Sequence, residues 1–178
     1  MATKTTLSLQ EFLRLPREQP DGAHYELDEG ELIRLSPAGR THAAIVIRIA
    51  SYLDALLDPT QFTVLGGEAG VILSDVDDRG IVRGADVAVE RASELDEGYA
   101  REPFVVAVEV VSKGQDPEDL ERKKNQYVRA GTETWLVYPR AGTIHVCNGS
   151  QLAVRRRGDR FHSIALNCEI DTGKFFVR

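Results

Sequence analysis

Two acidic residues, Asp86 and Glu109, lie beside runs of apolar side chains, where an ionised group needs a specific partner. Seven of the eight residues 104–111 are apolar and most are β-branched, and Glu109 is the exception. Such a run is typical of a strand that is buried on both faces. A carboxylate in this strand must contact a cation or a metal ion, or must lie where the strand opens into a cleft.

A second predicted strand, residues 81–89, carries Asp86 immediately before the apolar residues 87–89. Two carboxylates on adjacent strands would form a site of hard oxygen ligands, which suits Mg²⁺ or Mn²⁺. A bound ion of this kind would polarise a phosphoryl oxygen and lower the pKa of its water. A lysine nearby would then orient or deprotonate the attacking water and stabilise the developing negative charge.

A helix is predicted over 117–131, directly after the strand that carries the glutamate. Asp116 is a suitable N-cap, Pro117 suits the first helical position, and Gly131 is a typical C-terminal stop. The next apolar run, 134–138, is predicted to be a strand. A strand, a helix and a strand in this order normally make parallel neighbours in an α/β sheet.

The helix supplies two candidates for the lysine. Lys123 and Lys124 follow Leu120 by three and four residues, so both flank the face that should pack on the sheet, and helical geometry alone does not choose between them. Lys113 is a third candidate, because it would share a strand face with Glu109 if the strand continued that far. The simplest alternative is a buried ion pair between Glu109 and Lys123 with no catalytic role.

The rest of the chain supplies further elements of an α/β fold. Residues 8–15 are predicted to be a short helix with a capping box, residues 25–35 a hairpin that turns at Asp28-Glu29-Gly30, and residues 41–57 an amphipathic helix with His42 in its first turn. The remaining predictions are strands 62–65 and 70–73 around Gly66-Gly67, a polar turn at 75–80, a charged loop or short helix at 90–103, and antiparallel edge strands at 143–147, 151–156 and 161–166.

The chain as a whole has the composition of a globular protein. Its 178 residues are predicted to form a single domain, 1–178, and no apolar run has the ~18 residues of a membrane-spanning helix. Cys147 and Cys168 have no metal-ligand or redox spacing, and no leader-like apolar segment is visible, so we expect a cytoplasmic protein with no membrane association.

The formal charge of −6 argues against a protein that coats nucleic acid, but it leaves room for a local basic groove. Two basic clusters are present, residues 155–160 and residues 122–129, and such clusters are more often solvated faces than binding sites.

Three segments together resemble the Uma-two family of bacterial endonucleases, a branch of the PD-(D/E)XK restriction-endonuclease-like superfamily. They are Gly84-Ala85-Asp86, Val108-Glu109-Val110-Val111-Ser112, and the helical segment 119–131. The hairpin 25–32 with Ser36-Pro37 and His42, and the strand residues 135–139, resemble further signatures of the family in the same order. The resemblance covers residues 7 to 150. It implies a restriction-endonuclease-like core with a central mixed β-sheet flanked by helices.

The resemblance also implies roles for individual residues. Asp86 and Glu109 match the metal ligands, Lys123 matches a catalytic lysine that has moved to the helix, and Glu31 matches an N-terminal acidic position that assists the site. His42 matches a histidine at the start of the first long helix, for which a capping or surface role is an equal alternative.

The sequence departs from the family pattern at several positions. Val111 stands where the superfamily usually has its lysine, and Ala85 replaces the proline of the PD motif. Lys113-Gly114 replaces a proline and a serine, and Arg122 stands where a glutamate is frequent. None of these changes removes an expected metal ligand.

The predicted function is that of an endonuclease that hydrolyses phosphodiester bonds of nucleic acid, with DNA as the expected form and Mg²⁺ or Mn²⁺ as the cofactor. Cutting both strands of a duplex would need two sites, which is compatible with a homodimer, although the sequence specifies no interface. The first alternative is a catalytically inactive module of the same fold that binds nucleic acid or a protein partner. The second is a metal-dependent hydrolase of a smaller phosphoester.

Overall fold

The computed structural model describes residues 6–16, 24–74 and 79–176. Within these residues, eight strands form one mixed sheet in the order β2-β1-β4-β5-β6-β7-β8, and β3 also pairs with β4. The strands are β1 (Tyr25–Asp28), β2 (Glu31–Arg34), β3 (Phe62–Ser74), β4 (Ile81–Arg91), β5 (Val106–Val110), β6 (Glu133–Tyr138), β7 (Thr143–Asn148) and β8 (Gln151–Arg156). The expected mixed α/β sheet is therefore confirmed.

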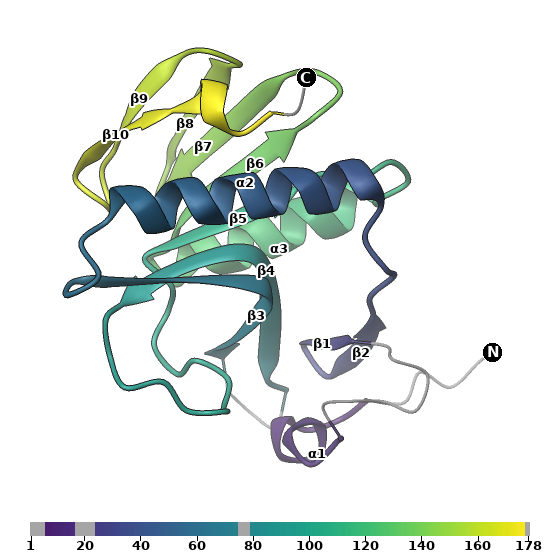
Figure 1. The fold of residues 1–178 in the computed structure, drawn as a ribbon. Coiled ribbons are helices and arrows are strands. Elements are labelled where there is room, and N and C mark those ends of the chain that lie inside the picture. The colour runs from purple at the N-terminus through teal and green to yellow at the C-terminus, as the bar shows by residue number, and fades with distance from the viewer. Residues whose placement is uncertain (1–5, 17–23, 75–78, 177–178) are drawn as a thin grey trace.

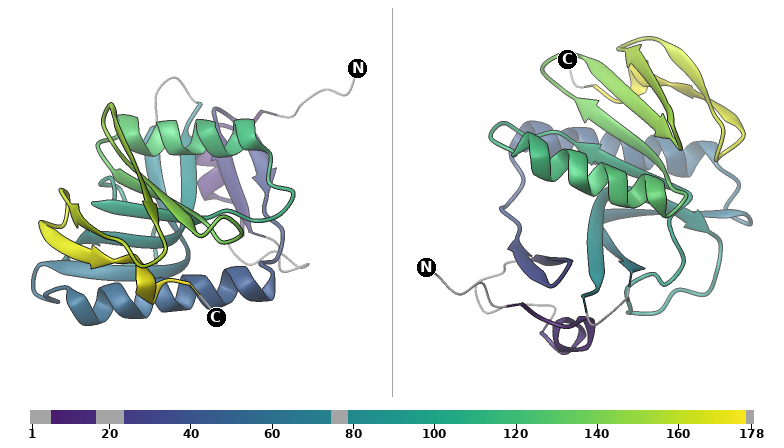
Figure 2. Two further views of the ribbon diagram at one scale, coloured as in Figure 1. Left: turned by 90° about the horizontal axis from the view of Figure 1, so that it is seen from above. Right: turned by 180° about the vertical axis from the view of Figure 1, so that it is seen from behind.

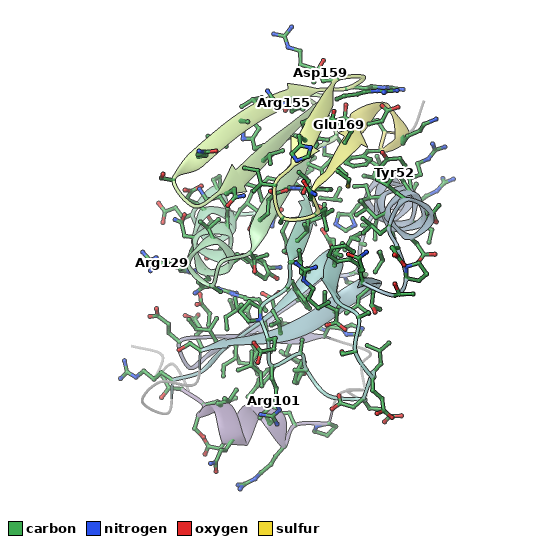
Figure 3. All side chains as sticks on the ribbon, turned by 90° about the vertical axis from the view of Figure 1, so that its left-hand side faces the viewer. Tyr52, Arg101, Arg129, Arg155, Asp159 and Glu169 are labelled. Carbon is green, nitrogen blue, oxygen red and sulfur yellow. The ribbon has the colours of Figure 1, made fainter. Side chains whose placement is uncertain are left out.

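Two helices cover opposite faces of this sheet, as Figures 1 and 2 show. Helix α2 (Arg40–Leu56) buries Ile45, Ile49 and Leu53, which recur every four residues and share one core cluster with apolar side chains of β4, β5 and β6. Helix α3 (Pro117–Arg129) is mostly polar and buries Leu120, Gln126 and Tyr127. Figure 3 views the molecule from the side, with Tyr52 of α2 and Arg129 of α3 on opposite sides of the sheet.

Local signals in the sequence specify both ends of α3. The Asp116 carboxylate accepts a hydrogen bond from Glu118 N, and Pro117 begins the helix. Gly131 follows it with φ +90°, a conformation that glycine adopts at little cost. Because this helix links β5 to β6, those two strands pair in parallel, as the strand, helix and strand order predicts.

The N-terminal predictions are also confirmed. Helix α1 (Leu9–Leu13) begins with the expected capping box, in which Ser8 and Glu11 bond to each other's backbone amides. Strands β1 and β2 form the expected antiparallel hairpin. Strand β5 is buried along its whole length, in agreement with its apolar sequence.

Strand β3 corrects one prediction. Residues 62–65 and 70–73 belong to a single strand, and Gly66-Gly67 does not turn the chain back. Gly67 and Glu68 adopt positive φ angles of +76° and +64°, and the pairing with β4 shifts between Gly66 and Ala69. This is a β-bulge, which bends a strand without ending it. The predicted turn at 75–80 lies partly outside the described residues.

The C-terminal region corrects another prediction. β7 and β8 extend the main sheet as expected, but β9 (Arg160–Ser163) pairs with β10 (Cys168–Asp171) in a separate sheet. The short helix η2 (Thr172–Lys174) follows. Phe161, Ile170 and Phe175 are buried beside Trp135, so burial of these side chains places the small sheet over the core rather than at the edge of the main sheet.

Residues 90–103 also differ slightly from expectation, because β4 continues to Arg91 and the remainder is a loop without a helix in the described structure. Cys147 and Cys168 are both free thiols. None of the helices in the described part of the chain has the length and apolar character that crossing a bilayer requires.

One feature of β4 positions the site. Strand β3 pairs with one edge of β4 along most of its length. On the other edge, β1 pairs at Val82 and β5 pairs at residues 87–89. Residues 83–86 therefore lie between the two partner strands, where side chains can reach the backbone of β4.

Candidate active site

A cleft of about 1090 Å³ opens where β5 ends. The segment between β2 and α2, the first residues of α2, and the loops that follow β5 and β6 form its walls. Four side chains predicted from the sequence, His42, Asp86, Glu109 and Lys123, all line it. The fold thus brings together residues from α2, β4, β5 and α3.

Asp86 is held by the strand next to it and by α2. Its Oδ2 accepts a hydrogen bond of 2.7 Å from Val110 N and lies 3.0 Å from His42 Nε2, which donates to it. The hydrogen bond to Asp86 raises the pKa of His42 above its ordinary value, and this effect exceeds the opposing effect of burial. His42 therefore contacts Asp86 and lines the cleft, and its side chain is only 16 % exposed.

Glu109 lies on β5 and is only 5 % exposed. Both of its carboxylate oxygens are 3.0 Å from Lys123 Nζ, but only Oε2 is aligned to accept a hydrogen bond. Oε1 is buried and has no hydrogen-bond partner. Burial raises the pKa of Glu109 to about 8, with repulsion from Asp86 and Glu26 adding to burial and attraction to Lys123 opposing it.

Lys123 extends from α3 into the gap along β4. Its ammonium group donates to Gly84 O at 2.7 Å and to Glu109 Oε2 at 3.0 Å, and lies 2.9 Å from Glu26 Oε1. Burial would lower the pKa of Lys123, but the two carboxylates outweigh it and hold that pKa well above the ordinary value. Lys123 is consequently a fixed positive charge at neutral pH.

A buried ionic network continues from Glu26 beneath the cleft. Arg83, which is 3 % exposed, donates to Glu26 Oε2 at 2.9 Å and to Gln126 Oε1 at 2.7 Å, and pairs with Asp28 at 2.7 Å. Gln126 in turn donates to Asp28 at 2.6 Å, and Arg122 pairs with the same carboxylate. The network ties the hairpin β1–β2, strand β4 and helix α3 together.

The structure separates the candidates that the sequence left open. Lys123 reaches Glu109, whereas Lys124 pairs with the exposed Glu121. Strand β5 ends at Val110, and Lys113 is an exposed residue on the wall of the cleft.

Glu31 is exposed on β2 and is not among the side chains that line the cleft. The acidic residue that the hairpin brings to the site is Glu26. Sequence reasoning missed Glu26, Arg83 and Gln126. The available signal was the alternation of Glu26 and Asp28 on one face of a short strand, together with a charged residue directly before Gly84.

The acidic pair provides a donor set that fits a hard divalent cation. Among the described residues, no three His, Cys, Asp or Glu side chains form a ready-made metal set. Mg²⁺ and Mn²⁺ do not require one, because they commonly keep several waters and take one or two carboxylates. Glu109 Oε1 is buried without a hydrogen bond, so it is an oxygen that could coordinate such an ion.

The charge of the cleft is opposite to that of the chain. Its lining contains five lysine and arginine residues against three acidic ones, a surplus of two positive charges with His42 neutral. The whole chain has a formal charge of −6. The cations that accompany Lys123 are Arg34, Arg40, Lys113 and Arg140.

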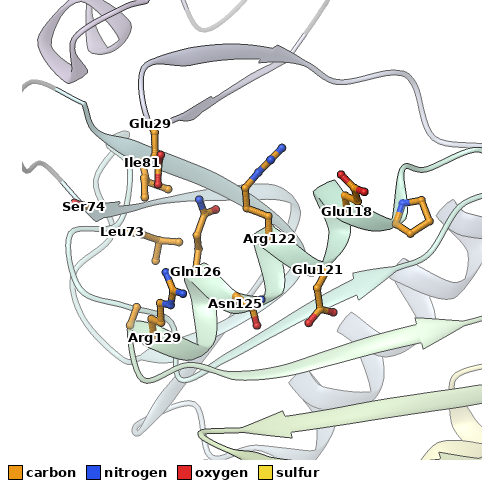
Figure 4. Close-up of a pocket in the computed structure, with 12 residues that line it drawn as sticks. Glu29, Leu73, Ser74, Ile81, Glu118, Glu121, Arg122, Asn125, Gln126 and Arg129 are labelled. Atoms are coloured by element: carbon orange, nitrogen blue, oxygen red, sulfur yellow. The ribbon is translucent and has the colours of Figure 1, made fainter.

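A second cavity of about 880 Å³ lies on the outer side of α3 and is shown in Figure 4. Glu29, Ile81 and Arg129 surround it, and it shares Arg122 and Gln126 with the ionic network. Neither Asp86 nor Glu109 lines this cavity, so it is separate from the acidic pair.

Comparisons with known proteins agree with this architecture. Residues 9–169 match the model of the Uma2 family, described as "putative restriction endonuclease". A crystal structure from Anabaena variabilis, described as "a putative nuclease belonging to DUF820", has a similar fold with a TM-score of 0.79. That chain is 18 % identical, and the similarity covers 96 % of this chain and 97 % of that one. No protein with a curated description matches. The expected fold and the expected family are both confirmed.

Proposed function

The chain belongs to the Uma2 family, and from this membership and the geometry of the cleft we propose that it is a divalent-metal-dependent endonuclease that hydrolyses phosphodiester bonds. The observation that carries the proposal is the meeting of Asp86, Glu109 and Lys123 in one cleft. Two carboxylates can hold a divalent ion that activates water, and a fixed cation can stabilise the charge that develops in phosphoryl hydrolysis.

Asp86 and Glu109 would hold the metal ion, either Mg²⁺ or Mn²⁺. When bound, the ion supplies Lewis-acid stabilisation of the phosphoryl oxygens and a more acidic water. Lys123 would position the attacking water and stabilise the negative charge that develops on the phosphate. Its raised pKa favours this role over that of a general base, because a protonated amine cannot accept a proton.

The cationic walls of the cleft support nucleic acid as the substrate. Arg40 begins α2, Lys113 follows β5 and Arg140 follows β6, so three different segments bring cations to the cleft that contains the acidic pair. Lysine and arginine side chains on such walls neutralise backbone phosphates, which supplies affinity without reading the base sequence. DNA is the proposed form of the substrate.

A cleavage assay tests the proposal. Supercoiled, linear and single-stranded DNA and single-stranded RNA would be incubated with the wild-type protein and with Asp86→Asn, in Mg²⁺ and in Mn²⁺. We expect metal-dependent internal cleavage of DNA by the wild type and a loss of about 10²-fold or more in the variant. Equal cleavage by both preparations would indicate a contaminating nuclease and would contradict the assignment.

The affinity for Mn²⁺ should increase with pH. The metal must displace the proton that Glu109 holds below about pH 8, so binding should weaken by about tenfold per unit as the pH falls from 8 to 6. The pKa of His42 is also raised, and protonated His42 should add to this loss because it competes with the metal ion for the Asp86 carboxylate. Calorimetric titration at pH 6, 7 and 8 would measure the dependence, and His42→Gln should reduce its steepness at the acidic end. An affinity that is constant over this range would argue against Glu109 as a ligand.

A catalytically inactive module that binds nucleic acid is the second candidate. The contacts of Lys123 favour it, because Glu26 compensates the charge of the ammonium group and Glu109 accepts its hydrogen bond without a metal. A protein that binds DNA with an affinity independent of divalent cations, and that cleaves none of the substrates, would support this alternative.

A further inference from the structure

We propose that Glu26 is the residue that positions Lys123, and that it does so through a closed ring of contacts with the backbone of Gly84. The inference rests on the proposed function insofar as Lys123 is catalytic. Sequence similarity pointed instead to Glu31, which is exposed on β2 and outside the cleft lining.

The ring consists of three contacts. Glu26 Oε1 accepts a hydrogen bond of 2.9 Å from Gly84 N, and Gly84 O accepts one of 2.7 Å from Lys123 Nζ. The ring closes because the same Glu26 oxygen lies 2.9 Å from Lys123 Nζ. The ammonium group is therefore fixed relative to β4, the strand that carries Asp86 two residues further on.

The gap along β4 makes this ring possible. At Val82 the edge of β4 is paired with β1, and at residues 87–89 it is paired with β5. The amide and the carbonyl of Gly84 lie between these pairings and are satisfied by a carboxylate and an ammonium group instead of by a strand. A buried backbone group must have such a partner, so the ring also stabilises the strand.

Gly84 itself is required for close packing on the opposite side. A Cβ atom at this position would lie 2.9 Å from Glu68 O on the bulge of β3. No side chain can be accommodated there without movement of the backbone of β3. Gly84 thus contacts the bulge of β3 on one side and the ring of Glu26 and Lys123 on the other.

The second carboxylate oxygen of Glu26, Oε2, is held by Arg83. Arg83 donates to Oε2 at 2.9 Å, and the Glu26 side chain is 4 % exposed. Burial would raise the pKa of Glu26, but Lys123 and Arg83 outweigh it and hold that pKa below the ordinary value. Glu26 is thus an ionised carboxylate with both oxygens engaged, which leaves little freedom for the lysine that it contacts.

Glu26 and Glu109 consequently have different roles. Glu109 has a buried oxygen, Oε1, that has no hydrogen-bond partner and could coordinate a metal ion. Glu26 is the permanent counterion of Lys123. Lys123 can remain in place when Glu109 binds a metal ion, because Glu26 Oε1 and Gly84 O still contact the ammonium group.

Two variants of the same network separate positioning from general stabilisation. Glu26→Gln removes the charge that contacts Lys123. Asp28→Asn is the matched control, because Asp28 pairs with the same Arg83 and is also buried but lies outside the ring. If Glu26→Gln fails to fold, Glu26→Asp keeps the charge for Arg83 and withdraws the carboxylate from Lys123 by one methylene.

The first measurement does not depend on activity. The folded proteins would be treated with acetic anhydride, and acetylation of Lys123 would be followed by peptide mass spectrometry, with Lys113 as the internal reference. We expect Lys123 to react about tenfold faster or more in Glu26→Gln than in the wild type, the effect of losing one charged hydrogen-bond partner, and to be nearly unchanged in Asp28→Asn. Equal rates in both variants would overturn the inference.

The second measurement is the rate of DNA cleavage at saturating Mn²⁺. Glu26→Gln should lower kcat by about 10- to 100-fold with KM and Mn²⁺ affinity retained, and Asp28→Asn should retain kcat. A normal kcat in Glu26→Gln would also overturn the inference. A wild type without nuclease activity would instead contradict the proposed function, and the acetylation result would still decide whether Glu26 positions Lys123.

Discussion

Replacement of Glu109 by alanine is expected to abolish Mn²⁺ binding while the domain remains folded. The substitution removes one of the two carboxylates of the proposed site, including the buried oxygen that has no hydrogen-bond partner. A single remaining carboxylate leaves a divalent ion bound mainly by water, so the heat of titration should fall below detection. Calorimetry of the wild type and the variant, with circular dichroism to establish folding, would measure the effect.

Glu102→Ala is the control for this experiment, because Glu102 is an exposed glutamate of the loop before β5. It should bind Mn²⁺ as the wild type does. Undiminished binding by the Glu109 variant would place the metal elsewhere. Absence of binding in the wild type as well would favour the structural ion pair and the non-catalytic module, unless addition of DNA restored binding, because nucleic acid can complete a metal site with its own phosphate oxygens.

Replacement of Lys123 by methionine should destabilise the protein by about 3–5 kcal/mol, the cost of leaving buried charges without their partner. Lys123 contacts Glu26, Glu109 and the carbonyl of Gly84. Methionine has a similar length and fills the same volume, so the loss would come from the missing charge rather than from a cavity. The free energy of unfolding from urea titration at pH 7 would measure it.

Lys124→Met is the matched control on the neighbouring residue. Lys124 pairs with Glu121, which is 59 % exposed, so its loss should change the free energy of unfolding by less than about 1 kcal/mol. Equal effects of the two single substitutions would show that the buried network does not depend on Lys123.

Glu26 and Glu109 both lie within 3.0 Å of the Lys123 ammonium group, but their other contacts differ. Glu109 contacts Lys123 but retains an oxygen without a hydrogen bond, and Glu26 has both oxygens occupied. A buried ionic network of this kind is weak evidence for stability, because desolvation of the charges offsets much of their attraction. Its value here is positional: it holds a cation beside an acidic pair on the adjacent strands β4 and β5.

Much of the fold follows from local features of the chain. The capping box of α1, the N-cap and glycine stop of α3, and the four-residue spacing of apolar residues in α2 act over a few residues and are visible in the sequence. The strand, helix and strand order makes β5 and β6 parallel by chain geometry alone. The two strands that carry Asp86 and Glu109 also follow, because each contains a local run of apolar residues.

The tertiary structure decided the features that depend on pairing between distant segments. Gly66-Gly67 could equally form a turn or a bulge. The segment is one strand because β3 pairs with β4 on both sides of these glycines. The side chains of β9 and β10 join the core through Trp135, a contact that no local pattern encodes.

The tertiary structure also decided which lysine and which glutamate of the hairpin contact the acidic pair and its neighbours. Helical spacing places both Lys123 and Lys124 near the sheet, and the gap along β4 selects Lys123 because Gly84 O and two carboxylates lie within reach of it alone. Glu26 is 58 residues from its partner Gly84, and its place depends on where β1 pairs with β4. The sequence by itself thus determined most of the helices and strands, including the two strands that carry Asp86 and Glu109, since those depend on local periodicity and chain connection. Only the register between distant strands decided which lysine joins them and which glutamate holds it.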